Sequence, residues 1–373
     1  MPRLRFPEFQ GKWDERTLGE IGDVKMCRRI FNEETSPIGE IPFYKIGSFG
    51  KDADAYISKE LYLDYKERFP FPKKGDILIS AAGTIGRTVI YNGEDAYYQD
   101  SNIVWIDNDN SIISNEFLFY ILQIVKFNTE GGTIQRLYNN ILKSTKFRNP
   151  SLIEQKKIAS LLSLIDERMQ HQMKIIQKLE SLSLSFMRKI FSQEIRFKDE
   201  NGEYFPDWKI QKLGEIATIT TGSSNREDSI LDGQYTFFDR SQDIRTSNRY
   251  LFDKEAIIVP GEGQTFIPKY YHGKFDLHQR TYAIFDFQEL NGKYLYYHIF
   301  YDDKHLQSQA VGSTVKSLRL PMFQTMPIAL PSLLEQTKIA KFLSSLDEKI
   351  EAEKQLLEQY KQQKAYLLQN LFI

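Results

Sequence analysis

Hydrophobic residues alternate at steps of three and four positions along two long stretches of the chain. This spacing of about 3.5 residues is typical of a coiled-coil seam. The first stretch carries it at Ile158, Leu162, Ile165, Met169, Ile176, Leu179, Phe186 and Ile190. The second carries it at Ile339, Leu343, Leu346, Ile350, Leu357, Tyr360, Leu367 and Leu371. We predict helix–helix packing by the first five residues of each series.

Both stretches begin with the same helix-start signal. A proline, Pro150 or Pro331, stands just before a Ser-x-x-Glu capping box. Each predicted helix runs for about 40 residues, a rod of roughly 60 Å at 1.5 Å per residue. Two such rods in one chain most simply pack on each other. Antiparallel packing would place the two blocks that precede them at opposite ends, and the helix pair would then act as a ruler.

Polar residues interrupt both seams at matching levels. Gln172 and Ser183 break the first seam where Glu353 and Lys364 break the second. Such residues usually fix register or partner at a cost in stability. The alternative is that the helices splay apart or meet solvent there. Acidic pairs also recur, as in Asp166-Glu167, and we interpret them as a solvated helix face.

The seams belong to a larger internal repeat. A Trp-x4-Leu-Gly-Glu-Ile opening at Trp13 returns at Trp208, and a Pro-Ser-Leu-x-Glu-Gln-x-x-Ile-Ala closing at Pro150 returns at Pro331. A repeat of this length indicates duplicated domains and not a solenoid. We predict a variable domain over 1–149, a long helix over 150–195, a second variable domain over 196–330 and a second long helix over 331–373.

The variable blocks have an α+β pattern. Each contains short strand-like runs separated by Gly and Asn-Gly turns, and one aromatic helix. The predicted strands are Ile41–Ile46, Asp76–Ser80, Thr88–Tyr91, Ile103–Ile106, Tyr235–Asp239, Ala256–Val259 and Thr281–Phe285. The aromatic helices are Phe117–Leu122 and Tyr294–Ile299, whose rings we place in the core because they occur at corresponding positions.

Three polar loops per block adjoin the predicted strands in the same order. Gln, Asn, Arg and Lys side chains can contact adenine and guanine in the DNA major groove, so these loops form a candidate reading surface. The Gly-rich turn 80–87 could approach a phosphate, or it could be an ordinary tight hairpin. The candidates are Tyr44, Lys45, Ser48, Ser80, Ala81, Gly83, Thr84, Arg87, Gln99, Ser101, Asn102, Arg240, Ser241, Gln242, Glu262, Gln264, Thr265, Gln279, Arg280 and Thr281.

Composition narrows the possible functions. The 373 residues contain no long apolar run and no signal-like segment, so we expect a cytoplasmic protein. A single cysteine and five scattered histidines predict neither a disulfide nor a metal site. No catalytic or cofactor-binding constellation is recognisable. The net charge of −1 counts against extensive phosphate neutralisation by this chain alone.

The repeated openings and closings, together with Gly75-Asp76-Ile77-Leu78, closely resemble the specificity subunits of type I restriction-modification systems. The resemblance covers essentially the whole chain. It implies two target recognition domains that each read half of a split double-stranded DNA site, and an antiparallel coiled coil that sets the gap. It also implies a non-catalytic adaptor for two modification (methyltransferase) subunits and for restriction (translocase/endonuclease) subunits.

In such a complex, S-adenosylmethionine, ATP and Mg²⁺ are expected on the partner subunits, with no cofactor bound by this chain. Two other interpretations remain open from the residues. A self-contained DNA methyltransferase with fused recognition domains is disfavoured because no cofactor site can be placed. A coiled-coil scaffold that does not bind DNA leaves the two divergent, loop-rich blocks unexplained.

Overall fold

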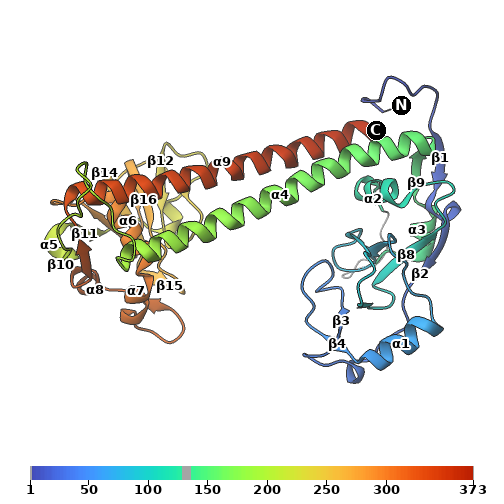
Figure 1. Ribbon diagram of the computed structural model, residues 1–373, viewed down its shortest axis with the longest axis horizontal. Coiled ribbons are helices and arrows are strands. Elements are labelled where there is room, and N and C mark those ends of the chain that lie inside the picture. Colours follow the sequence, from blue (N-terminus) through green and yellow to red (C-terminus); the bar gives the residue numbers. More distant parts are fainter. Residues whose placement is uncertain (1, 128–135, 373) are drawn as a thin grey trace. The chain divides into compact units, whose positions relative to one another are not determined.

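The computed structural model describes residues 2–127 and 136–372, which form two compact units (Figure 1). The first unit comprises Met1–His171 with Leu357–Ile373, and the second comprises Gln172–Leu356. Two helices of 40 residues, α4 (Leu152–Phe191) and α9 (Leu333–Phe372), contribute to both units. The two long helices predicted from the heptad pattern are therefore confirmed.

The described residues of the first unit form three small sheets. Their strand orders are β1-β9, β2-β8-β5-β6 and β4-β3-β7. The strands are β1 (Asp14–Thr17), β2 (Gly22–Lys25), β3 (Ile41–Tyr44), β4 (Tyr56–Ile57), β5 (Ile77–Ser80), β6 (Thr88–Ile90), β7 (Tyr97–Tyr98), β8 (Ile103–Asn108) and β9 (Lys146–Asn149). The shorter helices are η1 (Leu18–Glu20), η2 (Asn32–Glu34), α1 (Lys59–Arg68), α2 (Asn115–Ile124) and α3 (Asn139–Ser144).

The second unit has one larger sheet, with strand order β11-β17-β14-β16-β12-β13, and two strand pairs, β10-β19 and β15-β18. Its strands are β10 (Lys209–Lys212), β11 (Thr218–Thr221), β12 (Tyr235–Phe238), β13 (Arg245–Ser247), β14 (Phe252–Pro260), β15 (Glu262–Gly263), β16 (Lys269–Leu277), β17 (Thr281–Phe285), β18 (Lys316–Ser317) and β19 (Pro327–Leu330). Its shorter helices are α5 (Leu213–Ile216), η3 (Arg226–Asp228), α6 (Gly292–Tyr301), α7 (Asp303–Gln309) and α8 (Leu320–Gln324).

The repeated opening motif joins the start of each unit to the strand that leads into its long helix. β1 pairs antiparallel with β9, and β10 pairs in the same way with β19. The glycine of each Leu-Gly-Glu-Ile motif lies against a short helix. A Cβ at Gly19 would meet Lys143 Cβ at 3.0 Å, and one at Gly214 would meet Gln324 Cβ at 3.0 Å. A larger residue would push these elements apart.

The tryptophan of each opening bonds to the glutamate of the corresponding closing. Trp13 Nε1 donates to Glu154 Oε1 at 3.2 Å, and Trp208 Nε1 donates to Glu335 Oε2 at 3.1 Å. Arg5 adds a bidentate contact to Glu154, at 2.8 and 2.9 Å. Burial raises the pKa of the Glu335 carboxyl above its usual value, although Trp208 and the more distant Arg196 counteract this effect.

The glutamine of each closing binds the residue that caps the aromatic helix. Gln155 Oε1 accepts a hydrogen bond from the backbone N–H of Ser114, the residue that caps α2, at 2.9 Å. Gln336 Oε1 does the same for Asn291, which caps α6, at 2.8 Å. Both side-chain NH₂ groups donate to the proline carbonyl five residues back, each at 2.9 Å. The two glutamines are fully buried. Each Glu-Gln pair therefore connects the opening motif and the aromatic helix to the start of the long helix inside the unit.

Within each unit, the segments of the two long helices that belong to it pack against each other in antiparallel directions (Figure 1). In the first unit, Ile158 and Leu162 share a core with Leu371 and Phe372. In the second unit, Met187 and Ile190 share a core with Ile339 and Leu343. The start of each helix therefore meets the end of the other. Of the ten predicted packing residues, Met169, Leu346 and Leu357 are half-buried and the others are buried.

Three of the four polar residues of the seam, Gln172, Glu353 and Lys364, have partners inside the protein. Gln172 is buried, and its Nε2 donates to the backbone carbonyl of Glu353 at 3.1 Å and to Glu353 Oε2 at 2.5 Å. Lys364 Nζ lies 2.7 Å from Asp166 Oδ1, so this residue too is held within the packing. The alternative of splayed, solvated levels does not hold there. The solvated-face interpretation of the acidic pairs is wrong for Asp166, which also accepts a hydrogen bond from Tyr120 at 3.0 Å.

The fold class is confirmed as α+β, with β-rich mixed units joined by two long packed helices. All seven predicted strands correspond to observed strands, which differ from the predicted ends by a few residues. The aromatic helices are α2 and α6, and most of their rings are buried as expected. The strands β1, β9, β10 and β19 were not predicted.

Replacing Gln336 with Ala should lower the free energy of unfolding by about 1–3 kcal/mol, because the backbone groups of Asn291 and Pro331 lose their buried partner. Urea unfolding monitored by circular dichroism measures the loss. Gln355→Ala is the matched control, since Gln355 is exposed and its side chain bonds to Glu351, one turn earlier on the same helix. Equal effects of the two substitutions would contradict the fastening role of Gln336.

Candidate nucleic-acid interface

Two arginines from different loops of the second unit share one carboxylate. Arg280 precedes β17, Arg240 follows β12, and Glu262 opens β15. Arg280 Nη1 lies 2.8 and 2.9 Å from the two Glu262 oxygens, and Arg240 Nη1 lies 3.3 Å from Glu262 Oε2. Both arginines are exposed. Glu262 therefore holds two guanidinium groups at the surface in one place.

A second acidic residue organises the loop after β12. Asp239 is buried and accepts hydrogen bonds from the backbone N–H of Ser241 at 2.7 Å and from its hydroxyl at 2.5 Å. Arg245 lies 3.4 Å and Arg226 lies 4.0 Å from the same carboxylate. Burial alone would raise the pKa of Asp239, but the bonds from Ser241 and the two arginines outweigh it and lower the pKa. Asp239 thus stays ionised and fixes the loop.

A cavity of about 210 Å³ opens among these groups. Its lining residues are Arg226, Asp239, Arg240, His278, Gln279 and Arg280. Burial lowers the pKa of His278, and the nearby arginines reinforce this against the opposing effect of Asp239. His278 is therefore neutral at pH 7, and its Nδ1 accepts a hydrogen bond from the Arg280 backbone at 3.0 Å. Gln279 Nε2 bonds to Asn225 at 2.6 Å, which joins a further loop to the cluster.

The first unit brings its three predicted loops together through different bonds. Gln99 links the loop after β7 to the loop after β3, because its Oε1 accepts from the backbone of Ile46 at 3.0 Å. Arg87 Nη1 donates to the carbonyl of Phe49 at 2.8 Å, which joins the hairpin between β5 and β6 to the same region. The Ala81 backbone donates to the carbonyl of Asn102 at 2.8 Å. The three loops are therefore neighbours in space.

Four of the predicted contact residues are buried, which corrects their assignment to a surface. Ser80 Oγ donates to the carbonyl of Thr84 at 2.5 Å and accepts from the Arg87 backbone at 2.8 Å, so it closes a tight hairpin. The others are Ser48, Ala81 and Thr281. The remaining predicted residues are half-buried or exposed: Tyr44, Lys45, Gly83, Thr84, Arg87, Gln99, Ser101, Asn102, Arg240, Ser241, Gln242, Glu262, Gln264, Thr265, Gln279 and Arg280.

Several residues of these clusters, two arginines and a histidine, were missed from the sequence. Arg226 and His278 line the cavity of the second unit. In the first unit, Arg29 Nε lies 2.8 Å from Asp100 Oδ2, beside the loop that contains Gln99. His278 belongs to a predicted polar loop but was not selected as a contact residue, and nothing in the local sequence of Arg29 or Arg226 distinguishes them from other surface charges. Their roles follow only from the folded arrangement.

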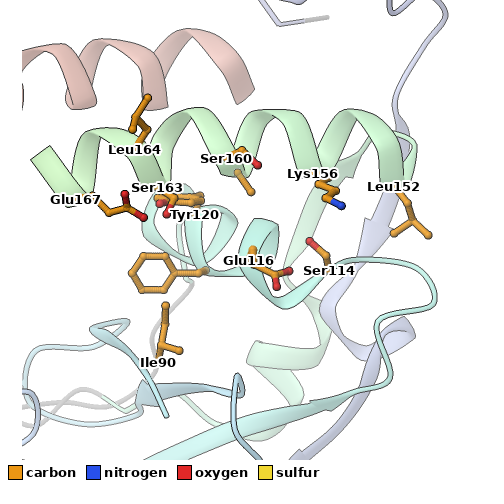
Figure 2. A pocket seen from close by; sticks show the side chains of 12 residues that line it. Ile90, Ser114, Glu116, Tyr120, Leu152, Lys156, Ser160, Ser163, Leu164 and Glu167 are labelled. Carbon is orange, nitrogen blue, oxygen red and sulfur yellow. The ribbon is translucent and has the colours of Figure 1, made fainter. Parts of the chain in front are cut away.

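A separate groove lies between α2 and α4 in the first unit, with a volume of about 800 Å³. Figure 2 shows Ser114 and Glu116 on one side and Lys156 and Ser160 of α4 on the other. Leu152, Leu164 and Ile90 give the groove exposed apolar walls. The corresponding groove of the second unit, of about 460 Å³, lies along α9 near the start of α6, and its walls include Lys293 and Lys341.

The same exposed apolar residues begin both long helices. Ile153 is 75% exposed and Leu334, its counterpart in the repeat, is 72% exposed. Their neighbours Leu152 and Leu333 are also exposed. Single exposed apolar residues are common, but recurrence at corresponding positions of a repeat is a feature of a shared surface. Each unit therefore presents a similar pair of exposed apolar residues at the start of its long helix.

Within residues 2–127 and 136–372, no group of three or more His, Cys, Asp or Glu side chains could hold a metal ion. No helix of these ranges is both long enough and apolar enough to cross a membrane.

Comparison with known sequences identifies the family. The profile of the type I restriction modification DNA specificity domain matches twice, over residues 10–181 and 206–362. The chain belongs to this family. A putative type I restriction enzyme specificity subunit from Haemophilus influenzae is 58% identical over 146 residues, 39% of this chain and 38% of that protein. The EcoDI specificity subunit from Escherichia coli is 35% identical over 156 residues, 42% of this chain and 35% of that protein.

These alignments span little more than a third of each of those two relatives. A longer match joins the chain to the putative MjaX specificity subunit of Methanocaldococcus jannaschii, at 25% identity over 97% of this chain and 93% of the relative. Among solved structures, the type I restriction-modification S subunit of M. genitalium superposes with a TM-score of 0.65. It covers 100% of this chain and 99% of that one at 20% identity, which supports the shared specificity-subunit fold.

Replacing Glu262 with Gln should increase the affinity of the isolated chain for random duplex DNA and steepen its salt dependence. The reason is that Arg240 and Arg280 lose the carboxylate that offsets one of their two positive charges. Fluorescence anisotropy between low and physiological salt measures both quantities, and the salt slope should steepen by about one. Glu203→Gln is the matched control, because it makes the same charge change at an exposed site outside the cluster. An identical response of both variants would rule out a DNA-facing arginine pair.

Proposed function

We propose that this chain is the DNA sequence-specificity subunit of a type I restriction-modification complex. Each β-rich unit reads one half of a bipartite site in double-stranded DNA. The observation that carries this proposal is the twofold match to the specificity-domain family, combined with one cluster of loops per unit that gathers arginine, glutamine and asparagine side chains.

In the second unit, Arg240, Gln279 and Arg280 are the residues we assign to base-edge contacts. Arginine can bond to the O6 and N7 atoms of guanine, and glutamine can bond to adenine. Glu262 orients both arginines before DNA arrives, which reduces the conformational entropy lost on binding. In the first unit the corresponding candidates are Arg87, Gln99 and Asn102.

The net charge of −1 indicates that partner subunits supply many of the phosphate contacts. We assign the grooves beside α4 and α9 to the binding of two modification (methyltransferase) subunits. A surface that occurs twice in one chain suits two copies of one partner. S-adenosylmethionine, and ATP with Mg²⁺, would bind to the modification and restriction (translocase/endonuclease) subunits. This chain contributes recognition and assembly, and the α4–α9 pair sets the gap between half-sites.

A self-contained methyltransferase is the competing enzymatic function. It would need S-adenosylmethionine to bind this chain, and the family match supports recognition and not catalysis. A scaffold without DNA binding would leave the clustered arginines of the second unit without a role.

Co-expression with the modification subunit in a methylation-free host tests the proposal. Single-molecule sequencing should find methylated adenines within one split motif of two short half-sites and a fixed gap. A hybrid that takes residues 1–149 from another family member should change one half-site and leave the other intact. The proposal fails if a purified, assembled complex produces no new methylation, or if the exchanged block leaves the motif unchanged.

The grooves predict a specific assembly defect. Leu152→Glu combined with Leu164→Glu places charges on the exposed apolar wall of the first groove and should reduce the modification subunits retained per chain from two to one. Native mass spectrometry of the co-purified complex measures this ratio. Leu63→Glu is the control, because Leu63 is similarly exposed on α1, outside the groove residues. Retention of two subunits by the double variant would exclude this groove as the docking site.

A further inference from the structure

The two copies of the repeat differ at one polar level of the helix pair. In the first unit, the ammonium group of Lys364 on α9 lies 2.7 Å from Asp166 Oδ1 on α4 and 5.7 Å from the centre of the Tyr120 ring on α2. The Tyr120 hydroxyl donates to the other Asp166 oxygen at 3.0 Å. The Lys364 side chain is only 18% exposed. Asp166 is thus paired with both the Tyr120 hydroxyl and the Lys364 ammonium group.

The second unit repeats the aspartate and the tyrosine of this arrangement, but not the lysine. Asp347 corresponds to Asp166, and Tyr297 corresponds to Tyr120, with its hydroxyl donating to Asp347 Oδ2 at 2.6 Å. The position of Lys364 is taken by Ser183, which is 4% exposed. The nearby Lys354 pairs with Glu180 at 2.7 Å. In the described ranges, no cation lies within ion-pair distance of the Asp347 carboxylate.

The space left by the missing lysine is a cavity of about 340 Å³. A water molecule occupies about 30 Å³ in the liquid, so the cavity has ample room for an aliphatic side chain. It is lined by Glu180, Ser183, Leu184, Met187, Tyr296, Tyr297, Phe300, Asp347, Ile350 and Lys354. Apolar and aromatic walls suit methylene groups, and the faces of tyrosine rings attract an ammonium group. Asp347 supplies the negative charge.

We propose that this cavity binds the ammonium end of a lysine side chain from a partner polypeptide. The protein itself contains the precedent, since Lys364 makes the same contacts at the equivalent level of the first unit. A lysine fits better than an arginine because the precedent is a single point contact to one carboxylate oxygen and not a planar, two-pronged one. The inference rests on the proposed function only in that a partner docks on this helix pair.

The electrostatics agree with an unfilled cation site. Burial raises the pKa of Asp347, and the opposing effects of Tyr297, Lys293 and Lys354 do not cancel it. A lysine ammonium at the position equivalent to Lys364 would stabilise this carboxylate directly. The exposed Leu184 at the cavity gives a partner side chain an apolar surface to approach along.

The test uses the full chain labelled with ¹³C-methyl methionine, because Met187 lines the cavity and Met326 is buried elsewhere in the same unit. Titration with Nα-acetyl-lysine amide should shift the Met187 methyl resonance in a saturable way and leave Met326 unchanged. Nα-acetyl-norleucine amide, which lacks the ammonium group, should bind at least tenfold more weakly. Ser183→Lys should abolish the shift, because the new side chain occupies the cavity from within.

Lys364→Ser provides the reciprocal variant, since it opens an equivalent cavity in the first unit. It should gain a second binding site for the same lysine amide, whereas Asp347→Asn should lose the first. Thermal unfolding confirms that each variant is folded. Equal binding of the norleucine compound, or binding that survives Ser183→Lys, would overturn the proposal. Binding of spermidine without binding of the lysine amide would assign the site to a free amine instead. None of these results depends on methylation, so failure here is distinguishable from failure of the proposed function.

Discussion

The repeated Glu-Gln pair at the start of each long helix is the constraint on which the rest of the structure depends. In both units the glutamate receives the indole N–H of the opening tryptophan. The adjacent glutamine accepts a hydrogen bond from the backbone N–H of the residue that caps the aromatic helix. It also donates to the carbonyl of the proline that precedes the long helix. The glutamates and glutamines are buried, so each lost bond leaves one of their polar atoms without access to water. Two distant segments, the opening motif and the start of the aromatic helix, are thereby fixed to the first turn of the long helix.

This fastening separates the parts of each unit that must stay the same from those that can vary. The strand pairs β1-β9 and β10-β19 and the packed glycines Gly19 and Gly214 repeat the same geometry in both units. The loops do not. Glu262 and Asp239 organise the polar cluster of the second unit through charge, whereas Gln99 and Arg87 organise the first through bonds to backbone groups. A common support therefore carries two chemically different surfaces.

The sequence predicted those features that depend on periodicity or on recurrence. The long helices, the aromatic helices and the main strands follow from patterns that a few residues cannot obscure. The short strands β1 and β9 were missed because each has four residues and acquires its stability from a partner about 130 positions away. The structure brings the candidate loops of each unit together, but burial could not be read from residue type. Ser80 and Thr281 are polar and fully enclosed, while Arg226 lines the cavity without any local signal.

The charged residues of the second unit's polar cluster mainly orient neighbouring side chains, and they attract a polyanion only secondarily. Glu262 offsets one of the two positive charges of Arg240 and Arg280, so the pair contributes less to long-range attraction of a polyanion than two free arginines would. Their value lies in geometry, because a guanidinium held by a carboxylate presents its remaining N–H groups in a fixed direction. A DNA-reading chain of net charge −1 is then physically consistent. In the proposed function, the oriented side chains discriminate between bases, and the partner subunits supply the sequence-independent attraction.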